Sequence, residues 1–70
     1  MVVVGQYVEF DPIGHIAFAG SEYYKGDVVL GEVVYVNYKH RWFSVEYGEN
    51  NAKTSFNFAD IGTAVSIIGN

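Results

Sequence analysis

The fold is decided by residues 28–58, which read VVLGEVVYVNYKHRWFSVEYGENNAKTSFNF. Apolar and polar residues alternate through three runs, 28–38, 41–47 and 52–58, and short turn-forming segments separate these runs. Alternation with a period of two is typical of β-strands whose two faces have different surroundings. The stretch therefore predicts an antiparallel meander of three strands.

The first hairpin takes its register from a tight turn centred on Lys39 and His40. Hairpin register follows from turn length, because each residue beyond the turn pairs with the one equally far along the other strand. The predicted pairs are Asn37–Trp42, Val36–Phe43, Tyr35–Ser44, Val34–Val45, Val33–Glu46 and Glu32–Tyr47.

The second hairpin turns at residues 48–51, which are glycine, glutamate and two asparagines. Glycine and asparagine tolerate the positive φ angles that tight hairpin turns require. The predicted pairs are Trp42–Asn57, Phe43–Phe56, Ser44–Ser55, Val45–Thr54, Glu46–Lys53 and Tyr47–Ala52.

The two turns agree on which face of the meander is apolar. That face holds Val34, Val36, Phe43, Val45 and Phe56, and we expect it to form the core. The other face is mixed: it holds Val33, Tyr35 and Trp42 beside an opposite-charge cross-strand pair, Glu46 and Lys53. A slip of one residue would exchange the two faces, so the pattern specifies the register strongly.

The flanking segments complete the sheet. Residues 2–10 predict another strand, with Val8 and Phe10 facing inward. Residues 63–68 predict the last strand, and residues 59–62 predict a single helical or 3-10 turn before it.

Two glycines and a long connection interrupt this order of strands. We expect a bulge or bend at Gly5 and a bend in the second strand at Gly31. Residues 11–26 form a long connection that begins with a turn and has room for a short strand at 16–18. A connection of this length in a small domain is functional or folded back as an irregular hairpin, and it is a candidate cover for Trp42.

This order of elements resembles the SH3-like barrel over nearly the whole chain. The resemblance implies an all-β, five-stranded antiparallel barrel, with one 3-10 turn before the last strand, as a single domain of residues 1–70. The Ala-Leu-Tyr type motif of SH3 domains and their proline-binding aromatic set are absent from the sequence. The resemblance therefore does not imply binding of PxxP peptides.

A second resemblance is carried by residues 31–47, GEVVYVNYKHRWFSVEY, followed by SFNF at residues 55–58. This segment is similar to small uncharacterised proteins of phages and prophages of Gram-positive bacteria. The similarity implies a genetic context and no chemistry.

Charge and composition restrict the partners and the compartment. Eight acidic and four basic residues give a net charge of −4, which argues against broad attraction to nucleic acid or anionic membrane and suits a partner with a basic surface. The chain has no cysteine, so it has no disulfide framework and no thiolate zinc site. Its first residues, MVVV, are too short for a signal peptide, and no apolar run reaches membrane-spanning length. We expect a cytoplasmic protein with no membrane partner.

Catalytic and metal-binding patterns are not found in the sequence. His15 and His40 have no spacing that suits metal ligands. Ser44 and Ser55 are expected to face each other on a strand surface without a base to activate either hydroxyl. Glu46 is predicted to form a cross-strand pair of opposite charge with Lys53. We therefore expect no enzyme, no metal and no cofactor.

The most distinctive chemistry lies at the first hairpin tip, YKHRW at residues 38–42, which carries half of the formal positive charge. Aromatic rings beside a cation suit a protein hot spot, a platform for single-stranded nucleic acid, or an aromatic cluster packed under the 11–26 connection. The expected site residues are Trp42, Tyr35, Tyr38, Arg41, Tyr23, Tyr24 and Asn37.

The function expected from these features is that of a non-enzymatic protein–protein interaction module. In its most specific form it is a phage-encoded protein that binds or inhibits a host protein, for example a defence nuclease. The alternatives are a single-stranded nucleic-acid-binding barrel and a subunit of a phage structural assembly. A homodimer is also expected to be accessible, through open strand edges, the outer-face residues Val33, Tyr35 and Trp42, and the apolar run at residues 2–4.

Overall fold

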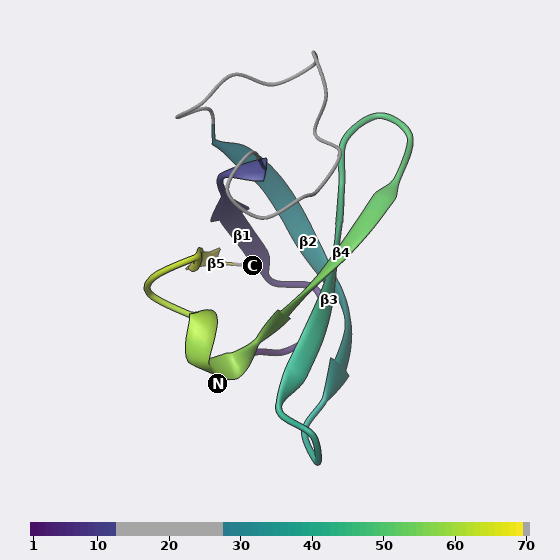
Figure 1. The fold of residues 1–70 in the computed structure, drawn as a ribbon. Helices are drawn as coiled ribbons and strands as arrows, with labels where there is room; N and C mark the ends of the chain where they lie inside the picture. The colour runs from purple at the N-terminus through teal and green to yellow at the C-terminus, as the bar shows by residue number, and fades with distance from the viewer. Residues whose placement is uncertain (13–27, 70) are drawn as a thin grey trace.

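The computed structural model describes residues 1–12 and 28–69, which form a single all-β sheet. Its strands are antiparallel and follow the order β4-β3-β2-β1-β5, so the predicted meander β2-β3-β4 is confirmed. The described elements are β1 (Tyr7–Phe10), β2 (Val29–Asn37), β3 (Trp42–Tyr47), β4 (Ala52–Asn57), the 3-10 turn η2 (Phe58–Asp60) and β5 (Val65–Gly69) (Figure 1). None of these is a helix long and apolar enough to span a membrane.

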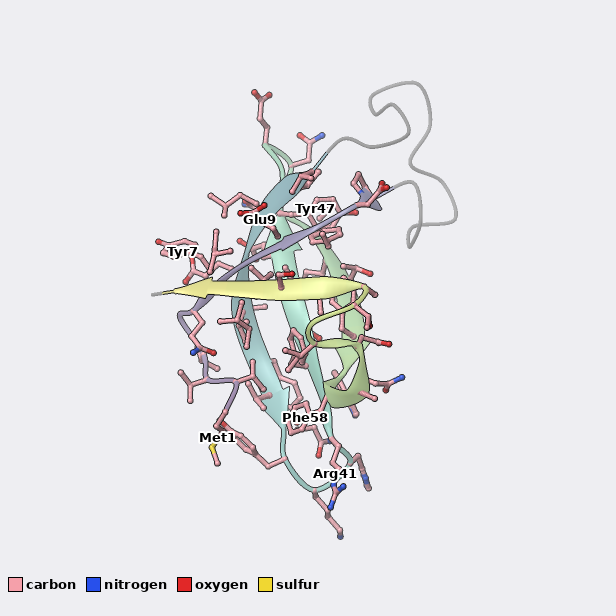
Figure 2. The ribbon with its side chains drawn as sticks, turned by 90° about the vertical axis from the view of Figure 1, so that its left-hand side faces the viewer. Met1, Tyr7, Glu9, Arg41, Tyr47 and Phe58 are labelled. Carbon is pink, nitrogen blue, oxygen red and sulfur yellow. The ribbon has the colours of Figure 1, made fainter. Side chains whose placement is uncertain are left out.

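The sheet is open, and β4 and β5 are its two edges. The expected closed barrel would need β4 and β5 to pair. The connection through η2 instead carries the chain to the far side of β1, where β5 pairs with β1. Figure 2 shows β5 crossing steeply in front of the long strands of the meander. The sheet therefore folds over itself into two layers that enclose the core.

The core lies between these two layers. The rings of Phe10 and Phe56 meet edge-on, with centroids 5.2 Å apart, and those of Phe43 and Phe56 lie 5.8 Å apart. The alternation predicted for β1 is confirmed, because Val8 and Phe10 are buried and their neighbours on the strand are exposed. The buried hydrophobic residues are Val2, Val8, Phe10, Val33, Phe43, Val45, Phe56 and Val65.

The second hairpin has the predicted register. All six predicted pairs between β3 and β4 are present, from Trp42 with Asn57 to Tyr47 with Ala52. The turn uses positive φ at Gly48 (76°) and Asn51 (53°), as its composition predicted.

The first hairpin follows the predicted register only near its tip. Beyond Tyr35–Ser44 a β-bulge shifts the pairing, so that Val33 lies opposite Val45 and Glu32 lies opposite Glu46. A bulge adds one residue to one strand and thereby exchanges the faces of the residues beyond it. Val33, not Val34, is therefore the buried residue, and the expected role of Val33 in an exposed self-association surface is wrong.

The N-terminal segment is a strand only over Tyr7–Phe10, so the expected strand 2–10 is too long. Gly5 forms the predicted bend with φ of 97°, and its N–H donates to the Val33 carbonyl at 2.9 Å. The Val33 N–H in turn donates to the Gln6 carbonyl at 2.8 Å. These bonds hold the turn against the bulged part of β2 and place Val2 in the core.

The segment after β4 matches the prediction with shifted boundaries. The 3-10 turn begins at Phe58 and the last strand at Val65. The Asp60 carboxylate accepts a hydrogen bond from the Asn57 N–H at 2.9 Å, which caps the turn. The expected strand at 16–18 and most of the 11–26 connection lie outside the described residues.

Gly31 does not bend β2, because the strand runs through it and the irregularity lies at Val33–Tyr35. Packing requires glycine at position 31, because a Cβ atom there would clash with Cγ1 of Val45 and would lie 3.1 Å from the Glu46 carbonyl oxygen. Val45 is β-branched and has little rotamer freedom to move aside.

We expect Gly31→Ala to lower the free energy of unfolding by about 1–3 kcal/mol, the usual cost of overpacking a core. Urea denaturation of the single variant and of Gly31→Ala/Val45→Ala tests this, because removing the Val45 methyl groups makes the two costs less than additive. A Gly31→Ala variant more stable than the parent would contradict the clash, since alanine at an uncrowded site stabilises by restricting the unfolded chain.

Candidate functional surface

The outer face of the meander carries an aromatic pair. Tyr35 on β2 and Trp42 on β3 have ring centroids 5.3 Å apart and an angle of 48° between the ring planes. Tyr35 is 49% exposed and Trp42 is half-buried, so both rings lie outside the core, as the register predicted. Both residues are on paired strands, so the sheet fixes their backbone positions.

Small polar groups border this ring pair. The hydroxyls of Ser44 and Ser55 lie 3.2 Å apart, which is the predicted cross-strand contact. Asn57, exposed at the end of β4, pairs with Trp42 in the register. An aromatic centre with a polar border is the usual composition of a protein-binding patch.

Arg41 and Asn37 shape the hairpin tip. Arg41 has φ of 61°, its N–H donates to the Asn37 carbonyl at 2.8 Å, and its carbonyl accepts from the Phe58 N–H at 2.9 Å. The Asn37 side-chain oxygen accepts a hydrogen bond from the His40 N–H at 3.0 Å. The arginine side chain is exposed at the tip (Figure 2), whereas the Asn37 side chain is engaged in the turn.

The Tyr38 side chain contacts other residues than the Tyr35–Trp42 ring pair. Its hydroxyl donates to the Val2 carbonyl at 2.7 Å, and its ring meets Phe58 with centroids 6.1 Å apart. Phe58 packs against Phe43 in the core, so Tyr38 is directed toward the inner layer and ties the N-terminus to the hairpin. Tyr23 and Tyr24 lie outside the described residues.

Groups for catalysis or metal binding do not gather in the described part of the chain. Within residues 1–12 and 28–69, no three His, Cys, Asp or Glu side chains are close enough to hold a metal ion. His40 is exposed in the hairpin turn, and His15 is not among the described residues. Within the described part of the chain, the hydrogen-bond partner of the Ser44 hydroxyl is the Ser55 hydroxyl.

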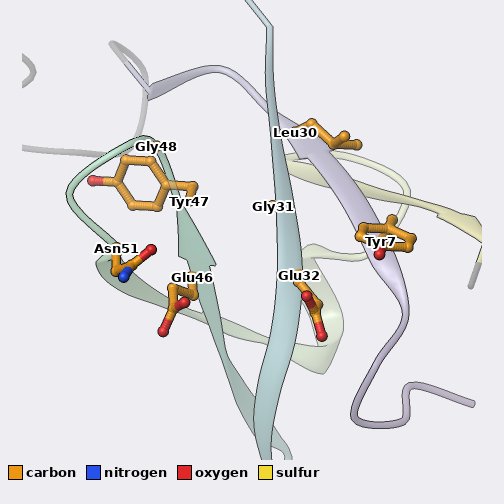
Figure 3. A pocket seen from close by; sticks show the side chains of 8 residues that line it. All are labelled: Tyr7, Leu30, Gly31, Glu32, Glu46, Tyr47, Gly48 and Asn51. Atoms are coloured by element: carbon orange, nitrogen blue, oxygen red, sulfur yellow. The ribbon is translucent and has the colours of Figure 1, made fainter.

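A second part of the same face was missed by sequence reasoning. Beyond the bulge, Glu32 and Glu46 become direct cross-strand neighbours, and a shallow pocket of about 200 Å³ opens beside them (Figure 3). Its lining includes Tyr7, Leu30, Glu32, Glu46, Gly48 and Asn51. The bulge brings these residues together, and nothing in the alternation of the sequence signals that bulge.

Comparisons of the chain with protein-family models, with curated proteins and with solved structures give no match.

Proposed function

We propose that this chain is a small non-enzymatic protein–protein interaction module whose binding surface is centred on Tyr35 and Trp42. The observation that carries the proposal is the ring pair itself, because two large aromatic side chains stand in contact outside the core on rigid strands. Tryptophan and tyrosine are enriched among residues that dominate binding energy at protein interfaces.

The groups around the ring pair favour binding over catalysis. Ser44 and Ser55 contact each other, and Asn37 is bonded within the turn. A nucleophile needs a base within hydrogen-bond reach, and a rigid aromatic patch needs none. The same groups suit the border of an interface, where they pair with partner atoms or with water.

We include in the proposal that the fold is of the SH3-like type. The strand order β4-β3-β2-β1-β5, the 3-10 turn before β5 and the crossing of β5 over the meander support this assignment. The peptide specificity of SH3 domains is not part of it.

The proposed partner is a host protein with a basic surface. This chain would then be a phage- or prophage-encoded protein that binds or inhibits that host protein in the cytoplasm. The net charge of −4 supports the basic surface of the partner, and the resemblance of residues 31–47 to small phage and prophage proteins supports only the genetic context. A defence nuclease suits it, because a surface that binds nucleic acid is basic.

Single-stranded nucleic acid is the second candidate ligand. The exposed Arg41 at the hairpin tip favours it, since a cation beside stacking rings suits unpaired bases. Two carboxylates on the same face, Glu32 and Glu46, oppose it by repelling phosphates. A homodimer or a subunit of a phage structural assembly would use the same exposed rings.

The test is affinity capture from a Gram-positive lysate on the immobilised domain, with and without nuclease, beside a Trp42→Ala bait. We expect a protein that is retained after nuclease treatment and lost from the variant bait. Sedimentation velocity of the purified domain separates a homodimer from a foreign partner. Capture that depends on nucleic acid, with oligonucleotide affinity that falls steeply with salt, would favour the second candidate instead.

A further inference from the structure

Two glutamates lie directly opposite each other on the outer face of the sheet. The register pairs Glu32 of β2 with Glu46 of β3. Among the described residues neither carboxylate forms an ion pair, although Lys53 stands across from Glu46 on β4. Like charges directly opposite each other on neighbouring strands are destabilising. A cation bound between two carboxylates placed in this way would offset their repulsion.

An aromatic and an apolar side chain flank this glutamate pair. Tyr7 of β1 is the register partner of Glu32, and its ring is 43% exposed. Leu30, two positions before Glu32 on the same face, is 56% exposed. Figure 3 shows Tyr7 and Leu30 on one side of the strand and Glu46 and Asn51 on the other. The pocket of about 200 Å³ here is smaller than the pockets of about 300–1,000 Å³ that hold cofactors and drug-sized ligands, and it suits a single side chain.

The glutamate pair and the ring pair belong to one continuous face. Trp42, Ser44 and Glu46 follow each other at two-residue steps on β3, so they point to the same side. With about 3.3 Å per residue, Glu46 lies about 13 Å along the strand from Trp42. One protein segment laid across Trp42 therefore also covers the glutamates.

We propose that the Glu32–Glu46 pair receives an arginine side chain of the protein that docks on Tyr35 and Trp42. This inference rests on the proposed function and identifies what the partner presents. The planar guanidinium donates hydrogen bonds in a forked geometry that suits two carboxylates, and it stacks on an aromatic face such as that of Tyr7. A lysine ammonium satisfies the charge but provides neither the fork nor the stacking.

The test is an NMR titration of the domain with N-acetyl-arginine amide, with N-acetyl-citrulline amide as an uncharged control of the same shape. We expect chemical-shift changes that cluster at Glu32, Glu46 and Tyr7 for the arginine compound, with millimolar affinity, and no such cluster for citrulline. The Glu32→Gln and Glu46→Gln variants should each bind about three- to fivefold more weakly, as expected for one exposed ion pair.

Thermal melts of the same variants give an independent measurement. Glu32→Gln should melt above the parent, because the substitution removes the repulsion between paired carboxylates. Glu49→Gln removes the same charge from an exposed turn residue that does not line the pocket, so it should change neither the melt nor the titration.

Three results would overturn the arginine site: scattered shift changes, equal responses to the arginine and citrulline compounds, or a stronger response of the same residues to calcium chloride. Its failure is distinct from failure of the proposed function. If Trp42→Ala loses the protein partner while no arginine response is seen, the result supports the ring pair as the binding surface and contradicts the arginine site. If the arginine response is seen while Trp42→Ala retains the partner, the result contradicts the proposed function of the ring pair as the binding surface.

Discussion

Replacing Phe43 by alanine is expected to leave the domain largely unfolded at 25 °C. The side chain is fully buried, and its ring lies 5.8 Å from that of Phe56 and 6.2 Å from that of Phe58. Truncating such a phenylalanine costs about 3–5 kcal/mol. A domain of this size has a total stability near the lower end of about 5–15 kcal/mol, so this loss removes most of it.

Circular dichroism and urea denaturation measure this loss directly. Val4→Ala is the matched control, because it also removes apolar side-chain atoms, but from a position that is 61% exposed. The control should retain the parental melt. A Phe43→Ala variant with the parental transition would contradict the two-layer core in which Phe43 packs against Phe56 of β4 and Phe58 of η2.

Replacing Trp42 by alanine is expected to weaken partner binding by about 30-fold or more at near-parental stability. Central aromatic side chains that become desolvated in an interface cost 2 kcal/mol or more on truncation, which corresponds to this factor. The folded domain is expected to lose little, because Trp42 is outside the core and its ring contact among residues 1–12 and 28–69 is with the exposed Tyr35. Tyr35→Ala should act in the same direction.

The measurement compares melting temperature and affinity for the captured partner on the same preparations. Val4→Ala again serves as the control, since it removes an exposed apolar side chain away from the sheet face. A Trp42→Ala variant that unfolds would assign the tryptophan to the fold. A variant that stays folded and binds with parental affinity would show that the ring pair is not the binding surface.

Local patterns in the sequence determined the meander and its chemistry. The alternation through residues 28–58 predicts β2, β3 and β4, and the glycine and asparagine turn sets every pair of the second hairpin. Burial of Phe43, Val45 and Phe56 and the outward direction of Tyr35 and Trp42 follow from this register. These features depend on neighbours within a hairpin, so period-two alternation and turn length suffice to predict them.

Tertiary contacts determined which residues of β2 beyond the bulge face the core. Val33 and Val34 are identical side chains, so no hydrophobic pattern tells which of them faces the core. The bonds from Gly5 to Val33 and from Val33 to Gln6 join β2 to a distant segment, and the bulge lies where they are made. The Glu32–Glu46 pair and the burial of Val2 accompany that long-range contact.

The open sheet and the position of Tyr38 were likewise decided by distant parts of the chain. The strand pattern gives five strands, but the pairing of β5 with β1, and not with β4, depends on where η2 directs the chain. Tyr38 resembles a surface aromatic in the sequence, and the Val2 carbonyl and Phe58 ring that engage it come from the N-terminal turn and from η2. Contacts between segments so far apart in the chain leave no period in the sequence, because they depend on how the layers cross and not on neighbouring residues.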